Sequence, residues 1–168
     1  MPVASVPSDE RKINIGVRVV ELPAYLRNNR TLVVRNGVNE VRYQDYARWA
    51  EPLDVAVQRI VRERLLANPK VATAETAPFP PEIRRDVDVA VRVFRCEGGF
   101  DAGGQKTARF SAVYEITKPQ EDGRVLVRKN FEGPVGTWDG ADYSQLAARL
   151  AQAVGALGDE ISAAVPSP

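Results

Sequence analysis

The stretch DVDVAVRVF, residues 86–94, decides the fold, because apolar and other side chains alternate along its whole length. A period of two residues is typical of a strand with one buried face. One face carries Val87, Val89, Val91 and Val93, and the other carries Asp86, Asp88, Ala90 and Arg92. We therefore expect a strand here whose valines pack on the core.

The residues that follow predict more strands, joined by loops that contain glycine. Residues 97–105, EGGFDAGGQ, are typical of a flexible connector, and their spacing does not match a phosphate-binding Walker loop. Residues 108–117 alternate again, EDG at 121–123 indicates a turn, and 124–132 predicts another strand. Three long strands in succession indicate an antiparallel meander.

The residues before this stretch predict shorter strands. Residues 12–20 alternate, with Ile13, Ile15, Val17 and Val19 in phase. Asn36-Gly37 is a strong hairpin signal, because a type I′ turn needs a positive φ at both central residues. It predicts strands at 31–35 and 38–43. A short strand at 70–74 precedes a proline-rich loop.

Two segments predict amphipathic helices. The first runs from about 51 to 67, with Pro52 in its first turn, where a missing N–H costs nothing. Tyr46 and Trp49 belong to a turn or short helical lead-in, and we expect both to pack in the core. The second follows Asp139 or Asp142 as N-cap. Its apolar stripe is Tyr143, Leu146, Leu150, Val154, Leu157 and Ile161.

This order of elements predicts one α+β domain. Two amphipathic helices would cover a mostly antiparallel sheet, as a single layer on one face. A chain of 168 residues fits one domain. We place the domain at residues 12–165 and expect residues 1–11 to be a disordered leader.

The composition argues against catalysis and metal binding. There is no histidine and a single cysteine, Cys96, so Ser/His/Asp and Cys/His sets and Cys/His zinc sites are excluded. Cys96 lies in an alternating stretch and is expected to be a passive strand residue. Asp86 and Asp88 point to one face, where we expect solvated side chains rather than an acid/base pair. The sequence predicts neither an enzyme nor a cofactor.

The charge and hydropathy argue against nucleic-acid binding and against a membrane-spanning helix. The formal net charge is +1, without the basic surface that nucleic acid selects. No segment approaches the ~20 apolar residues of a membrane-spanning helix.

Two short motifs, in a fixed order, give the chain a family resemblance. The first is Leu22-Pro23 with Tyr25-Leu26, after the strand INIGVRVV. The second is RWAEPL, in which we single out Arg48, Trp49, Glu51, Pro52 and Leu53 as a structural signature. With TLVVR between them and the valine strand later, the chain resembles the ABC-type transport auxiliary lipoproteins, the paraquat-inducible protein C-like family.

The resemblance implies a non-enzymatic periplasmic component of an intermembrane transport system. The implied partners are a mammalian-cell-entry-type substrate-binding protein, a permease and an ATPase. The implied location is the periplasm, where an N-terminal lipid anchor would hold the full-length protein to the outer membrane. Cys96 is internal and cannot be the lipidated cysteine. Either the lipobox precedes residue 1 or this member is not anchored, and we favour the first. A homo-oligomer is possible by analogy.

Two functional hypotheses follow. In the first, the protein is a docking or gating module in lipid or hydrophobic-compound transport and envelope integrity. Its partner or lipid contact would be Leu22, Pro23, Tyr25 and Leu26, which could equally form a lid over the end of the sheet. In the second, the protein is a soluble periplasmic lipid-binding carrier or sensor, which needs an apolar pocket.

Overall fold

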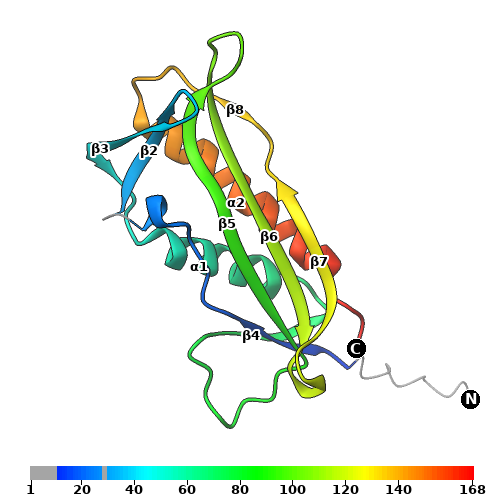
Figure 1. Ribbon diagram of the computed structural model, residues 1–168. Coiled ribbons are helices and arrows are strands. Elements are labelled where there is room, and N and C mark those ends of the chain that lie inside the picture. Colours follow the sequence, from blue (N-terminus) through cyan, green and yellow to red (C-terminus); the bar gives the residue numbers. More distant parts are fainter. Residues whose placement is uncertain (1–10, 28–29) are drawn as a thin grey trace, which may run out of the picture.

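The computed structural model describes residues 11–27 and 30–168, so most of the expected leader lies outside the described residues. The strands are β1 (Ile13–Val17), β2 (Thr31–Asn36), β3 (Glu40–Arg48), β4 (Val71–Thr76), β5 (Val87–Phe100), β6 (Lys106–Lys118), β7 (Arg124–Glu132) and β8 (Gly136–Thr137). The helices are α1 (Leu53–Leu66) and α2 (Tyr143–Ala164), with short 3-10 helices η1 (Ala24–Leu26) and η2 (Pro119–Glu121). Figure 1 shows their arrangement.

The strands form one mixed sheet. Its order is β3-β2-β5-β1-β4, and β6 pairs with β5, β7 and β8. Antiparallel pairs join β2 to β3 and β6 to β5, β7 and β8. Parallel pairs join β1 to β4 and to β5, and β2 to β5. The expected mostly antiparallel sheet is therefore a mixed one, because alternation predicts a strand and its buried face but not its partner.

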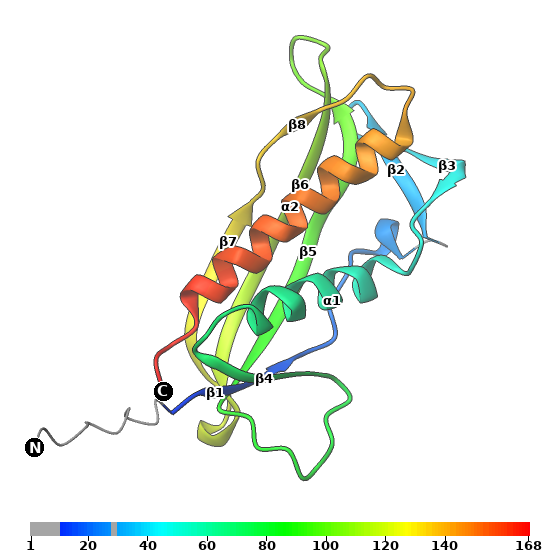
Figure 2. The same cartoon turned by 180° about the vertical axis from the view of Figure 1, so that it is seen from behind.

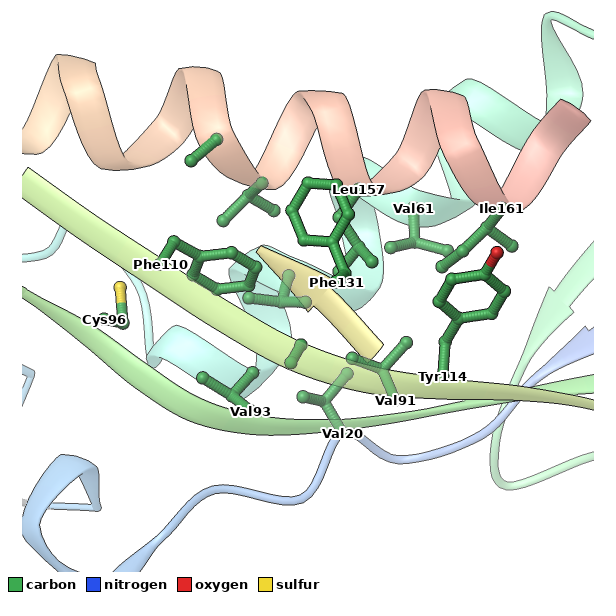
Figure 3. Close-up of a cluster of buried hydrophobic side chains, with 14 of the residues drawn as sticks. Val20, Val61, Val91, Val93, Cys96, Phe110, Tyr114, Phe131, Leu157 and Ile161 are labelled. Atoms are coloured by element: carbon green, nitrogen blue, oxygen red, sulfur yellow. The ribbon is translucent and has the colours of Figure 1, made fainter. Parts of the chain in front are cut away.

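Both helices lie on the valine face of the sheet. They are behind β5, β6 and β7 in Figure 1 and in front of them in Figure 2. Figure 3 shows the core between these layers, where α2 packs over β5 and β6. The fully buried residues there include Val61, Val89, Phe110, Tyr114, Ile116, Leu157 and Ile161. The α/β packing thus buries the faces that the sequence periods predict.

The long hairpin of β5 and β6 corrects the expected glycine-rich loop. β5 continues through Gly98 and Gly99 to Phe100, so the connector is only residues 101–105. A Cβ at position 98 would lie 3.0 Å from Leu146 Cδ2 and 3.1 Å from Trp138 Cζ2. Gly98 therefore serves close packing of the strand against α2, rather than flexibility.

The segment before α1 is a strand rather than a helical lead-in. β3 extends to Arg48, and the side chain of Tyr46 is fully exposed, so the expectation that it packs in the core is wrong. Trp49 is half-buried against the core. The helix α1 begins at Leu53, two residues later than expected, so Pro52 is its N-cap residue rather than a member of its first turn. The tyrosine and tryptophan matched the helical period without being helical.

Two other boundaries differ from the sequence expectations. β1 ends at Val17, so Val19 is exposed and Val20 is buried in its place. The Asn36-Gly37 hairpin is present, and Gly37 has φ +74°. However, Asn36 pairs with Glu40, which makes the loop three residues long instead of two.

Candidate interaction surface

The first signature motif forms a turn that is tied to the sheet. The N–H of Leu26 donates to the carbonyl of Pro23 at 3.0 Å, which closes η1. The Arg27 Nε donates to the carbonyl of Leu22 at 2.8 Å. Leu22 and Leu26 are each only 8% exposed, so most of their apolar surface is already covered within the chain.

Tyr25 fixes the same turn over β2 and β5. Its hydroxyl donates to the carbonyl of Phe94 at 3.1 Å, and the Arg35 guanidinium lies 5.5 Å from the centre of its ring. Burial, and then the nearby carboxylate of Glu97, raise the pKa of the Tyr25 hydroxyl well above its usual range. The phenol therefore remains a hydrogen-bond donor at any physiological pH.

The second signature motif places the start of α1. The N–H of Trp49 donates to the carbonyl of Arg30 at 2.7 Å, and Arg48 pairs with Thr31 across the hairpin. Glu51 accepts from Arg59 of α1 at 2.6 Å. Pro52 then begins the helix, and Leu53 is buried in the core. The contacts of this motif within the chain are those of a structural element.

The two motifs meet in a groove of about 390 Å³. Leu22 and Leu26 line one side, and Pro52 and Leu53 line the other. Arg27, Arg30 and Asp54 supply charges to the groove. The remaining candidates, Pro23, Tyr25, Arg48, Trp49 and Glu51, do not line it. The groove, bordered by the expected contact residues, is the surface that the two motifs build together.

The structure also contains a buried ionic cluster that the sequence did not reveal. Glu97 is 2% exposed, and its carboxylate accepts from Arg35 Nε at 2.6 Å and from Arg35 Nη2 at 3.1 Å. Arg95 Nε lies 3.3 Å from the same carboxylate. Glu97 was assigned to the glycine-rich loop. Alternation continued past residue 94 across a β-bulge would have placed it on a strand.

Asp86, just before β5, and Asp88, within it, differ from expectation. Asp88 is buried, and Arg85 Nε donates to its carboxylate at 2.7 Å, so this side chain is paired rather than solvated. Asp86 accepts from the N–H of Asn14 at 2.8 Å. Each carboxylate thus has its own structural partner. Within residues 11–27 and 30–168, no group of three or more Cys, Asp or Glu side chains could hold a metal ion.

Neither α1 nor α2 is both long and apolar enough to cross a membrane.

Residues 1–162 match the family described as ABC-type transport auxiliary lipoprotein component. The chain belongs to this family. The resemblance drawn from the two motifs is thereby confirmed. Members of the family are auxiliary components of transport systems, which places the chain among transport-associated envelope lipoproteins rather than in a known class of enzyme. A search of curated proteins finds no match.

Several solved structures have a similar fold, and each match covers almost the whole of this chain. A DUF330 protein from Xanthomonas campestris has a TM-score of 0.78 at 18% identity, and the match covers 92% of this chain and 85% of that one. The PelC dodecamer from Paraburkholderia phytofirmans has a TM-score of 0.53 at 11% identity, covering 93% and 91%. A hypothetical protein from Chlamydia trachomatis has 0.52 at 10%, covering 92% and 99%. At these identities the likeness shows a shared fold.

Proposed function

We propose that this protein is a docking or gating module of an ABC-type, mammalian-cell-entry intermembrane transport system. The observation that carries the proposal is the family match over residues 1–162. The internal use of both signature motifs supports it, because they build a scaffold and a groove rather than a constellation for catalysis. The protein would act by contact and without a cofactor, in lipid or hydrophobic-compound transport and envelope integrity.

The proposed setting is the periplasm. A lipid anchor on a cysteine upstream of residue 1 would hold the protein at the outer membrane. Its partners would be the substrate-binding protein of the mammalian-cell-entry class, and through it the permease and ATPase. These assignments rest on the family match.

The proposed contact surface is the groove between η1 and the start of α1. Pro23 and Tyr25 are only half-buried, so they can still contribute atoms to a partner beside it. Leu22 and Leu26 would act mainly by shaping the groove, because most of their surface is covered. The exposed guanidinium of Arg27 offers a positive charge to a carboxylate of the partner.

A binding measurement tests this proposal. The purified mammalian-cell-entry-type protein of the same system would be immobilised, and binding of this chain would be followed by biolayer interferometry. We expect Arg27→Glu to weaken binding by about tenfold or more, as loss and reversal of a charged contact does. Arg128→Glu, on β7 away from the groove, should bind like the wild type. Equal binding of all three chains would refute the groove, and no binding by the wild type would refute the docking role.

The alternative, a soluble periplasmic lipid-binding carrier or sensor, has one observation in its favour. A groove of about 650 Å³ lies beside the proline-rich loop, with Val19, Phe79 and Val113 among its lining residues. This volume lies in the range of small-molecule sites. Native mass spectrometry of the purified protein decides between the two. A bound mass of several hundred daltons that organic solvent extracts would favour the carrier, and a bare polypeptide would favour docking.

A further inference from the structure

A further pocket is lined by residues at the end of the β5–β6 hairpin and by Arg35 of β2. Figure 1 shows that this end of the hairpin lies beside β2. The pocket has a volume of about 420 Å³. Three arginines from three strands line it: Arg35 of β2, Arg95 of β5 and Arg109 of β6. Two carboxylates, Glu97 and Asp101, are also in its lining. The pocket therefore carries a net positive charge, although the whole chain is almost neutral.

The register of β5 and β6 places the polar side chains on one face. Glu97 pairs with Arg109, and Gly99 pairs with Thr107, without a bulge between them. Because alternate residues of a strand share a face, Arg95, Glu97, Arg109 and Thr107 all project to the same side. Gly99 keeps the floor open between them. A Cβ at that position would meet no atom closer than 3.7 Å.

The existing contacts leave part of this donor set unused. Arg35 gives two N–H groups to Glu97 and one to the carbonyl of Val38 at 3.2 Å, so its guanidinium is committed. Asp101 accepts from the N–H groups of Gly103 and Gln105 within its own loop. Arg95 Nε lies 3.3 Å from the Glu97 carboxylate, and the Arg95 side chain makes no well-aligned hydrogen bond among the described residues. Across residues 11–27 and 30–168, Arg109 has no ion-pair or hydrogen-bond partner.

A buried hydroxyl in the same pocket gives independent support for a ligand. Thr107 is 3% exposed and lines the pocket, and its Oγ1 has no hydrogen-bond partner among the described residues. A buried polar group without a partner is costly, so such groups are rare without a ligand or water. An oxyanion in the pocket would give this hydroxyl an acceptor.

The rim of the pocket is apolar. Val38 is 86% exposed and lines the pocket, and Phe100, which is 50% exposed, lies at the end of β5 beside it. A cationic floor below exposed apolar side chains matches a ligand that has an anionic group and an apolar part. Guanidinium groups favour phosphate because their planar N–H pairs fit two of its oxygens.

We propose that this pocket binds a phosphate-bearing amphiphile such as a phospholipid. Arg95, Arg109 and the hydroxyl of Thr107 bind the phosphate, and Val38 contacts the apolar part. Glu97 positions Arg35 and Arg95 and does not touch the ligand. This inference goes beyond the docking role and does not rest on it, since it concerns a different surface and needs no partner protein.

Isothermal titration calorimetry of the purified chain at low salt tests the proposal. The probes are dihexanoyl phosphatidylglycerol below its micelle concentration, inorganic phosphate, and hexyl glucoside as an uncharged amphiphile. We expect the phospholipid to bind about tenfold more tightly than inorganic phosphate, and hexyl glucoside not to bind. Equal affinity for phosphate alone would overturn the amphiphile, and equal affinity for hexyl glucoside would overturn the anion site.

Two variants locate the site. Arg109→Gln should weaken phospholipid binding by about tenfold or more, since a charged hydrogen bond is lost. Arg128→Gln, an exposed arginine on the same face of the sheet and outside the pocket, should bind like the wild type. Thr107→Val keeps the shape and removes the hydroxyl. It should weaken binding several-fold while the melting temperature stays the same or rises. Unchanged binding by Arg109→Gln or Thr107→Val, or no binding by the wild type, would overturn the proposal.

Discussion

Cys96 lies on β5, and its thiol is buried in the core (Figure 3). Burial, and then the neighbouring carboxylate of Glu97, raise the pKa of this thiol to about 12. The thiolate is the reactive form, so the native thiol should be inert. We expect alkylation by iodoacetamide at about pH 8 to be far slower in the folded chain than in urea, measured by intact mass. Comparable rates would show that the thiol is accessible.

The same pKa shift predicts a loss of stability in alkaline solution. The folded state holds the thiol proton more tightly than the unfolded chain, in which the thiol has a pKa of about 8.5. The stabilisation is therefore complete below that pH and is lost as the pH rises toward about 12. We expect the melting temperature of the wild type to fall more steeply over this range than that of Cys96→Ala. Parallel curves for the two chains would contradict the assigned shift.

Trp49 gives a prediction about the start of α1. Its side chain is half-buried, although the sequence suggested a core residue that pins the helix. We expect Trp49→Ala to lower the free energy of unfolding by about 1–2 kcal/mol, because only part of the ring leaves water on folding. Leu65→Ala, at a fully buried position, should cost about 2–5 kcal/mol. Urea titrations of the two variants provide the comparison. An equal loss in both would restore the core assignment for Trp49.

At the scale of single elements, helix α2 shows what the sequence reveals well. Its apolar stripe is buried from Leu146 to Ile161, and the carboxylate of Asp142 accepts from the N–H groups of Ser144 and Gln145, as a predicted N-cap should. A period and a cap are local properties. What its two glycines, Gly155 and Gly158, pack against is not a local property. They face Arg64 of α1, not the sheet, and only the packing of the helices determines this.

Gly155 and Gly158 form a matched pair for testing that packing. A Cβ at 155 would lie 3.0 Å from the flexible end of Arg64, at Nη2, whereas a Cβ at 158 would lie 2.7 Å from Arg64 Cγ and 3.1 Å from its Cβ. Alanine favours a helix over glycine by about 1 kcal/mol. We therefore expect Gly155→Ala to raise the free energy of unfolding and Gly158→Ala to lower it, in urea titrations. The same sign for both variants would show that α1 and α2 are not so closely packed.

At the scale of the whole molecule, the sequence predicts the layers better than the topology. The valines of β5 and the stripes of both helices identify the buried faces, but the parallel pairing of β1 with β4 depends on a contact across almost sixty residues. The candidate surface shows the same limit. The two motifs were recognisable separately, but their meeting in one groove, and the pairing of Glu97 with Arg35 of another strand, follow from the tertiary fold alone.

The sheet also leaves a strand edge that bears on assembly. β3 ends the strand order with nine residues, and Tyr43 and Tyr46 are exposed on it. An uncovered edge offers backbone N–H and C=O groups to another chain. We predict that this protein forms a homo-oligomer through β3, and that the oligomer is closed, as most soluble homo-oligomers are.

Native mass spectrometry of the wild type and of Tyr46→Lys measures this assembly. A lysine on an edge strand opposes pairing with a second chain. Since the side chain of Tyr46 is fully exposed, its replacement should leave the melting temperature within about 1 °C of the wild type. We expect the wild type to give a single closed oligomer and the variant to give mainly monomer at the same concentration. An oligomer that survives in the variant would assign the interface to another surface, and a monomeric wild type would refute assembly through β3.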